Sequence, residues 1–367
     1  MGGVVGGEYG DLNYYQAPTY QSYWGPPLII NGRLYYMVRK TPGDSWLGMR
    51  CVDIYTGEEI WFRNVGSAGA MGGGTPMTVY GQLFYFDGAN GHGVSPFIWN
   101  IGQYNWTVFD ANSGELVYTI SNPPVALSFR AGIPGASGPM LLTGKVDDYG
   151  SIIAYYMNGW NNWLLKWNST ALLINYGISP DNLYTPPVGK IIPWSKGIEW
   201  NVTIPHRESP PGCAPGFYTG TPATDGKVVF ATTADIMSGR DNFTLVAYSA
   251  KDGHELWHSD FANIFISGST LWNFFGPIKD GIMTVFNPHS MRWWGFNAST
   301  GVKLWGPTEA YENAWDMYIG TNAAYGKLYV GTYGGRIYCH ELKTGKTLVD
   351  LYSSTCRLRN TLWHISY

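Results

Sequence analysis

The sequence predicts an all-β protein, a β-propeller made of four-stranded sheets, and three observations support this prediction. Glycine and proline are numerous, with 48 and 22 residues in a chain of 367, as expected of a chain with many tight turns. Aromatic residues make up 16% of the chain and charged residues only 13%. An eleven-residue phrase that usually closes on an aromatic residue recurs along the chain at about the spacing of propeller sheets.

The composition also excludes several classes of protein. A disordered chain would lack this aromatic content, and a helical bundle would be richer in Ala, Glu, Lys and Leu. The formal net charge is −3, and without a basic excess we expect no nucleic-acid partner. No run approaches about 18 apolar residues, so we expect no transmembrane segment.

The recurring phrase has the pattern of a β-hairpin. Asp53 is placed to accept hydrogen bonds from the turn that follows it, and Gly57 supplies a backbone position with positive φ. Trp61 closes the phrase on a strand, where it is large enough to pack between neighbouring sheets. The five copies of the phrase cover residues 51–61, 108–118, 247–257, 295–305 and 339–349.

Equivalent residues of the other copies receive the same structural roles. A degraded copy spans residues 163–200, places Trp200 at its end and is split by an insertion near residues 171–196. Tyr118 and Val349 take the closing position in the second and last copies. The other turn and docking residues are Asp110, Gly114, Gly253, Trp257, Gly301, Trp305 and Gly345.

A second phrase, with the order strand, Gly turn and strand, precedes each hairpin. Two phrases together give four strands, which is the unit of a propeller sheet. The second phrase covers residues 27–36, 76–85, 222–230, 277–285 and 322–330, and the six units that result cover about 20–64, 68–120, 130–205, 210–260, 268–306 and 313–350.

The chain is expected to consist of an N-terminal extension, residues 1–19, and a single propeller domain, residues 20–367. Its tail, residues 360–367, resembles an innermost strand at residues 269–276. Either the tail completes the first sheet, which would remove unpaired edges, or the chain belongs to a longer propeller. The predicted total is therefore six to eight blades.

In its ideal form the hairpin phrase reads Ala-x-Asp-x-x-Thr-Gly-x-x-x-Trp, and it resembles the tryptophan-docking repeat of PQQ-like (pyrroloquinoline quinone) propellers. The resemblance covers about residues 20–367. That superfamily includes quinoprotein alcohol dehydrogenases, which hold PQQ and calcium at the central channel, and an outer-membrane assembly lipoprotein. Because many members hold no quinone, the resemblance implies the fold more strongly than any one function.

The chain departs from the catalytic members of that superfamily. No two of its four cysteines are adjacent, no Cys-x-x-Cys-His motif is present, and no calcium ligands can be assigned by motif. We therefore predict no cofactor and no metal site and assign no catalytic residue, with PQQ and Ca²⁺ as the alternative. The sequence does not decide whether Cys213 and Cys356 form a disulfide.

The best ligand candidates lie at the expected starts of three innermost strands, near the mouth of the central channel. Each start carries Trp followed by a polar residue, and neighbours on a strand point to opposite faces. The Trp set could stack on a sugar or a quinone, the polar set could bind a ligand, or the Trp set could simply pack between sheets. The six residues are Trp272, Asn273, Trp315, Asp316, Trp363 and His364.

Two long loops are further candidates for binding, because binding residues often lie on loops of a rigid scaffold. They are residues 90–95 and the insertion around residues 161–194, whose Trp and Asn content suits contact with carbohydrate or protein. The insertion could equally be a flap that buries its own aromatic residues.

The leading functional hypothesis is a non-catalytic, exported or surface-associated binding and scaffold propeller with a protein or glycan partner. The alternatives are a quinoprotein-like dehydrogenase and a polysaccharide-active propeller enzyme. An extracellular or cell-surface location is favoured by the composition and by five sequons; residues 1–8 do not read as a signal peptide, so a cytoplasmic location stays open. The oligomeric state is not predicted. The acceptor residues of the sequons are Asn105, Asn168, Asn201, Asn242 and Asn297.

Overall fold

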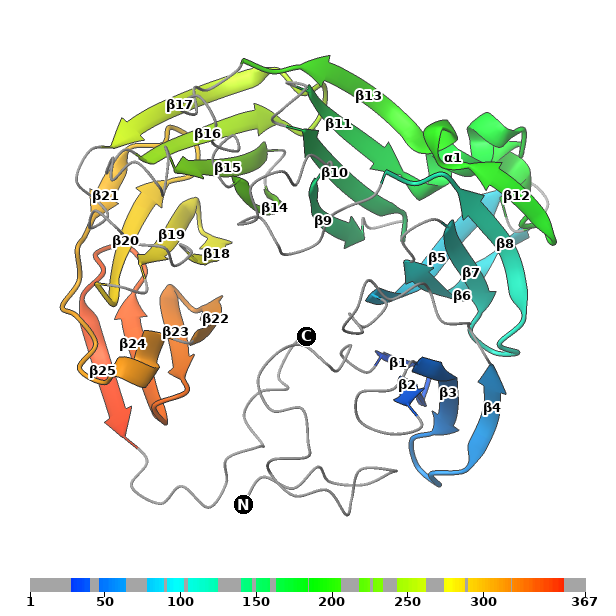
Figure 1. Ribbon diagram of the computed structural model, residues 1–367, viewed down its shortest axis with the longest axis horizontal. Coiled ribbons are helices and arrows are strands. Elements are labelled where there is room, and N and C mark those ends of the chain that lie inside the picture. The colour runs from blue at the N-terminus through cyan, green and yellow to red at the C-terminus, as the bar shows by residue number, and fades with distance from the viewer. Residues whose placement is uncertain are drawn as a thin grey trace. The chain divides into compact units, whose positions relative to one another are not determined.

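The structure is a computed structural model. It describes residues 28–39, 46–63, 78–88, 91–101, 105–124, 140–146, 150–158, 163–183, 185–205, 218–224, 227–233, 243–261, 274–287, 290–317 and 319–352. These residues form an all-β propeller fold with one α-helix (Figure 1).

The chain divides into two compact units, which are described separately. Unit 1 comprises Met1–Ala126, Val146–Ile153 and Trp167–Glu199, and unit 2 comprises Leu127–Lys145, Ala154–Lys166 and Trp200–Tyr367. Within the described residues, no helix is both long and apolar enough to cross a membrane.

Unit 1 contains two sheets. The first has the order β1-β2-β3-β4, with bounds β1 (Leu28–Ile30), β2 (Arg33–Arg39), β3 (Trp46–Asp53) and β4 (Glu59–Arg63). The second has the order β12-β8-β7-β6-β5, with bounds β5 (Thr78–Gly88), β6 (Gly91–Ile101), β7 (Asn105–Asp110), β8 (Leu116–Ser121) and β12 (Lys190–Pro193).

A third sheet, with the order β13-β11-β10-β9, has strands in both units. Its bounds are β9 (Met140–Val146), β10 (Ile152–Asn158), β11 (Trp163–Asn168) and β13 (Ile198–Thr203). Between β11 and β13 the chain forms α1 (Ser169–Tyr176), η2 (Pro180–Asn182), β12 and η3 (Trp194–Gly197). This segment adds β12 in parallel to the outer edge of β8, with Lys190 opposite Tyr118.

Unit 2 contains three four-stranded antiparallel meanders, which follow one another along the chain from green to red (Figure 1). The first strand of each meander is next to the first strand of the following one, since β18 contacts both β14 and β22. The bounds are β14 (Tyr218–Thr224), β15 (Lys227–Thr233), β16 (Phe243–Ser249), β17 (Glu255–Phe261), β18 (Phe274–Lys279), β19 (Ile282–Asn287), β20 (Arg292–Asn297), β21 (Lys303–Trp305), β22 (Ile319–Ala324), β23 (Lys327–Thr332), β24 (Arg336–Glu341) and β25 (Thr347–Tyr352), with η4 (Ala314–Met317) before β22.

The described residues thus form six sheets, one for each repeat unit of the sequence, except that β12 of the third unit joins the second sheet. A total of six to eight blades is not confirmed by them. The extent of the propeller domain, residues 20–367, and the N-terminal extension stay predictions.

The expected hairpin turn in residues 76–85 is wrong. Strand β5 continues through Gly81, and the hairpin lies instead between Gly88 and Gly91. A side chain at Gly81 would lie 3.0 Å from Cδ1 of Ile30, on β1 of the neighbouring sheet. The glycine at this position therefore allows two sheets to approach each other closely and is not part of a turn. The loop expected at residues 90–95 is also wrong, since Gly91–Ile101 forms strand β6.

Candidate functional site

The turn between the third and fourth strands repeats with nearly the same geometry in five sheets. In the first sheet the Gly57 N–H donates to the carbonyl of Asp53 at 2.8 Å, and Oδ1 of Asp53 accepts from the backbone N–H groups of Tyr55 and Thr56. These two bonds favour the charged carboxylate and hold the pKa of Asp53 below its ordinary value. The turn glycines Gly57, Gly114, Gly253, Gly301 and Gly345 all have φ between 69° and 77°.

A tryptophan from the preceding sheet docks on the turn glycine of the next sheet. Ring atoms of Trp61 come within 2.6 Å of the place where a side chain on Gly114 would begin. The Trp61 indole N–H donates to the carbonyl of Ala111 at 3.1 Å. The guanidinium of Arg63 reinforces this joint by donating to the carbonyls of Gly114 and Ser113 at 2.9 and 3.0 Å.

Three further joints follow the same plan in unit 2. The Trp305 indole packs on Gly345 and donates to the carbonyl of Leu342 at 2.9 Å. The Trp200 and Trp257 indoles pack on Gly253 and Gly301, but their buried Nε1 atoms have no hydrogen-bond partner. All four rings are thus packed against the backbone of the next sheet, which indicates a structural role for them.

Among the six candidate ligand residues, Trp315 and Asp316 are described, and both lie in η4 rather than at the start of a strand. Asp316 is fully buried, and its carboxylate accepts hydrogen bonds from Thr332 at 2.6 Å and from the Tyr338 hydroxyl at 2.8 Å. The strand start expected here is therefore wrong, because these bonds fold the segment into a short helix against β23 and β24. Trp272, Asn273, Trp363 and His364 lie outside the described residues.

Trp315 precedes this buried anchor in the sequence, and its own side chain is 57% exposed. Its backbone N–H donates to Oδ1 of Asn313 at 3.0 Å. Tyr333, 56% exposed, lies in the β23–β24 turn beside Gly334, and a side chain on Gly334 would collide with the Asp316 carboxylate. One exposed aromatic side chain, Trp315, thus lies on a helix that Asp316 anchors, and a second, Tyr333, lies in the turn beside it.

A second buried polar chain, which the sequence did not indicate, connects the last two sheets. The Trp293 indole N–H donates to the Tyr311 hydroxyl at 2.8 Å, and this hydroxyl lies 2.8 Å from Nε2 of His340. On the other side of the ring, Nδ1 of His340 lies 3.2 Å from the Thr347 hydroxyl.

Burial of His340 lowers its pKa to about 4, and burial of Tyr311 raises the pKa of its hydroxyl. The rings of Tyr311 and Tyr338 stack at 3.7 Å. No residue of this cluster could have been selected from the sequence, because Tyr311 lies in a loop and His340 occupies a variable position of the repeat. The cluster is closed to solvent, so it can stabilise two sheets but cannot bind a substrate.

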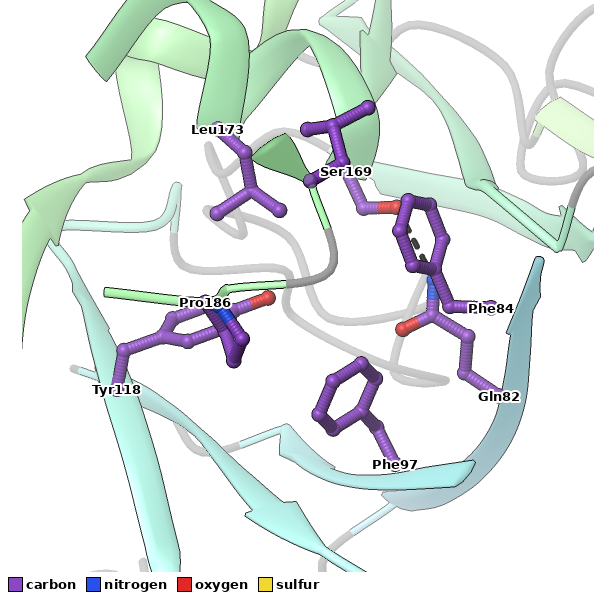
Figure 2. A pocket seen from close by; sticks show the side chains of 8 residues that line it. Gln82, Phe84, Phe97, Tyr118, Ser169, Leu173 and Pro186 are labelled. Atoms are coloured by element: carbon purple, nitrogen blue, oxygen red, sulfur yellow. Dashed lines mark hydrogen bonds between the residues drawn. The ribbon is translucent and has the colours of Figure 1, made fainter. Parts of the chain in front are cut away.

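One pocket lies in unit 1, between the second sheet and the segment that contains α1. Figure 2 shows Phe84, Phe97 and Tyr118 facing Leu173 and Pro186 across it. Its cavity volume is only about 10 Å³, about the room that one water molecule needs, so the pocket is too small for a ligand.

The polar side chains of this pocket are already bonded. The amide of Gln82 donates to the Gly150 carbonyl at 2.6 Å and accepts from the Trp99 indole at 2.6 Å. Gln82 and Ser169 are joined by a longer contact of 3.5 Å (Figure 2). The pocket therefore has few polar groups with which to orient a ligand.

The insertion buries much of its own aromatic surface. Trp167 and Trp194 stack at 6.1 Å with 10° between their planes, and the Trp167 indole donates to the Trp194 carbonyl at 2.8 Å. Trp106 meets both rings edge-on. These contacts favour the flap that the sequence left open, while Val188 and Ile191 stay exposed on the outside.

The predicted acceptor asparagines differ in their surroundings. Asn105 and Asn201 are exposed, whereas Asn168 caps α1 and donates to Glu199, and Asn297 caps its own turn. Asn242 lies outside the described residues, as do Cys213 and Cys356. Glycosylation and the disulfide stay predictions.

Metal ligands are not grouped in the part of the chain that the structure describes. No cluster there brings together three His, Cys, Asp or Glu side chains that could hold an ion. Asp316, the one described carboxylate among the candidates, is fully engaged with Thr332 and Tyr338, so its arrangement does not fit a calcium ligand.

Comparison with known families supports the repeat assignment. Residues 193–366, just under half of the chain, match the family model described as outer membrane protein assembly factor BamB. This part of the chain is therefore similar to that family. The resemblance that the hairpin phrase indicated is thereby confirmed.

Two solved structures are similar in fold. BamB from Moraxella catarrhalis is 10% identical with a TM-score of 0.44, covering 88% of this chain and 73% of that chain. The computationally designed Ika8 protein is 12% identical with a TM-score of 0.42, covering 92% and 89%. No curated protein matches the sequence.

Proposed function

We propose that this chain is a non-catalytic binding propeller and that the surface around Trp315 contacts its partner, a protein. The observation that carries the proposal is the exposure of Trp315 on a helix whose next residue, Asp316, is locked in place by two buried hydrogen bonds. Because the backbone that carries Trp315 is already anchored, less conformational entropy remains to be lost when a partner covers this side chain. Tryptophan is also enriched at the energetic centres of protein interfaces.

Similarity to a family described as an outer membrane protein assembly factor supports a protein partner and a place outside the cytoplasm. The composition and the exposed sequons at Asn105 and Asn201 support the same location. Glu312, which lies just before η4, and Asp350, on β25, both accept hydrogen bonds from Arg336 and leave this group of three side chains with one negative charge in excess. A partner with an apolar contact and a basic rim would complement it.

The proposal is tested by placing a photo-crosslinking amino acid at residue 315 and, as a matched control, at residue 325. Tyr325 is 91% exposed and lies at the other end of β23, in the β22–β23 turn. We expect a discrete adduct from position 315 and none from position 325 in extracts of the source cells. Equal labelling from both positions, or from neither, would contradict the proposal.

The partner identified by mass spectrometry is then purified and titrated against the wild-type chain and Trp315→Ala. We expect Kd to rise at least tenfold for Trp315→Ala and to stay unchanged for Tyr325→Ala. A parallel titration with PQQ and Ca²⁺, followed by Trp fluorescence, is expected to show no saturable quenching. Saturable quenching that a chelator abolishes would favour the quinoprotein alternative instead.

A further inference from the structure

A buried contact that contains a histidine joins the last two sheets. The Tyr311 hydroxyl lies 2.8 Å from Nε2 of His340 and accepts the indole N–H of Trp293 at 2.8 Å. Tyr311 and His340 are 4% and 0% exposed. All three residues are described and belong to unit 2. The burial of this contact therefore does not depend on any other part of the chain.

The described residues that surround the imidazole are neutral. Nε2 of His340 faces Tyr311, Nδ1 lies 3.2 Å from the Thr347 hydroxyl of β25, and the residue opposite on β23 is Leu328. A proton on His340 would therefore place a positive charge among neutral groups, which is unfavourable unless the surroundings open to water. The charged side chains of the cluster are bonded elsewhere, Asp316 to Thr332 and Tyr338, and Arg336 to Glu312 and Asp350.

The helix that carries Trp315 begins directly after this contact. Only residues 312 and 313 separate Tyr311 from η4. The ring of Tyr311 also stacks on that of Tyr338 at 3.7 Å, and the Tyr338 hydroxyl donates to the Asp316 carboxylate of η4 at 2.8 Å. Tyr311 thus supports η4 in two ways, through the chain and through Tyr338. Movement of Tyr311 away from His340 would weaken both supports.

We propose that the contact between Tyr311 and His340 is an acid-sensitive latch. A proton taken up by His340 opens the contact, loosens η4 and weakens the binding of the protein partner at Trp315. The opening of the latch is a property of this chain alone, whereas the release of the partner rests on the function proposed above.

The direction of the pH dependence follows from burial. Burial lowers the pKa of His340 to about 4, although a hydrogen bond with the backbone of Gly345 opposes part of this effect. In an open segment the imidazole would return to about 6.5. The open form therefore binds the proton more tightly, so the latch is closed above pH 6.5 and opens as the pH falls toward 4.

Hydrogen–deuterium exchange of the full chain at pH 7 and pH 4.5 tests the latch without a partner. After correction for the intrinsic exchange rates, the opening equilibrium of residues 311–317 should rise about fiftyfold between these pH values. Residues 243–249, in β16 of the first meander of unit 2, serve as the internal reference and should change much less. An equal rise in both segments would overturn the proposal, because acid would then loosen unit 2 as a whole.

Two variants assign the effect to one imidazole. His340→Gln should abolish the rise in residues 311–317, whereas the matched variant His258→Gln should retain it, because the His258 side chain is already 50% exposed. The same rise in His340→Gln as in the wild-type chain would overturn the proposal. The comparison of the two segments in the wild-type chain decides the matter even if His340→Gln does not fold.

The effect on binding is measured with the partner captured at residue 315, titrated at pH 7 and pH 4.5. We expect Kd to rise at least tenfold in acid for the wild-type chain and less than threefold for His340→Gln. Equal pH dependence in the two proteins would overturn the release of the partner. Failure of the proposed function is distinct, since it is seen as absence of the adduct at residue 315, while the exchange experiment still tests the latch.

Discussion

The turns at residues 53–58 and 110–115 have almost the same internal structure and very different surroundings. Both have an aspartate that accepts two backbone N–H groups and a glycine with φ near 70°. Among the described residues only the second is covered by an indole, and Ala111 is fully buried while Ile54 is 43% exposed. The comparison shows that the local sequence determines the turn, whereas the neighbouring sheet determines its burial and its contribution to stability.

The largest effect is expected from removing the indole that distinguishes the two turns. Trp61→Ala should lower the free energy of unfolding by about 3–5 kcal/mol, because it empties a buried site and leaves the Ala111 carbonyl with one donor fewer. Ile60→Ala, on the same strand but 41% exposed, should cost no more than about 1 kcal/mol. Urea denaturation measures both, and equal costs would show that Trp61 does not hold the joint.

The contact between the last two sheets contains the buried His340, so its contribution to the free energy of unfolding should depend on pH. The pKa of His340 is about 4 in the folded chain and about 6.5 when unfolded. Between these two pH values the unfolded chain binds more protons than the folded chain. The stability that the neutral His340 contributes is therefore fully present above pH 6.5 and is lost as the pH falls toward 4. The loss from this residue reaches about 3 kcal/mol.

Urea denaturation of the wild-type chain and His340→Gln at pH 7 and pH 4.5 measures this loss. The difference in stability between the two proteins should shrink as the pH falls, since Gln cannot be protonated. A pH-independent difference would mean that His340 is not neutral and buried in the folded chain.

The smallest effect is expected at the proposed contact surface. Trp315→Ala should change the free energy of unfolding by no more than about 0.5 kcal/mol, because the side chain is 57% exposed. Asp316→Ala is the matched control and should cost about 1–3 kcal/mol, since it leaves Thr332 and Tyr338 without their buried acceptor. If Trp315→Ala were the more damaging change, Trp315 would be part of the core.

Much of the fold could be predicted from the sequence, because the turn chemistry is local. An acceptor side chain, a glycine four residues after it and a closing Trp specify one hairpin, whichever sheet contains it. The prediction failed at Gly81, where the same residue type serves a contact with Ile30 of another sheet. A single sequence does not distinguish a glycine that is required because the backbone has a positive φ from one that is required because a neighbouring side chain leaves no room for a Cβ atom.

The candidate site was predicted only in part. Trp315 and Asp316 were selected, but their place in η4 depends on Thr332 and Tyr338, which are distant in the sequence. The parallel pairing of β12 with β8 and the contact between Tyr311 and His340 are likewise long-range. Such contacts arise from packing of sheets and leave no periodic trace in the residues that make them.

The central claim is that an indole docked on a turn glycine holds neighbouring sheets together, and two glycine substitutions test it most directly. Gly57→Ala should cost about 1 kcal/mol, the price of a side chain at positive φ. Gly114→Ala should cost about 2–4 kcal/mol in urea denaturation, because the new methyl group also collides with Trp61. Equal losses in the two variants would contradict the claim, since they would mean that the contact between Trp61 and Gly114 adds nothing to the cost of a side chain at positive φ.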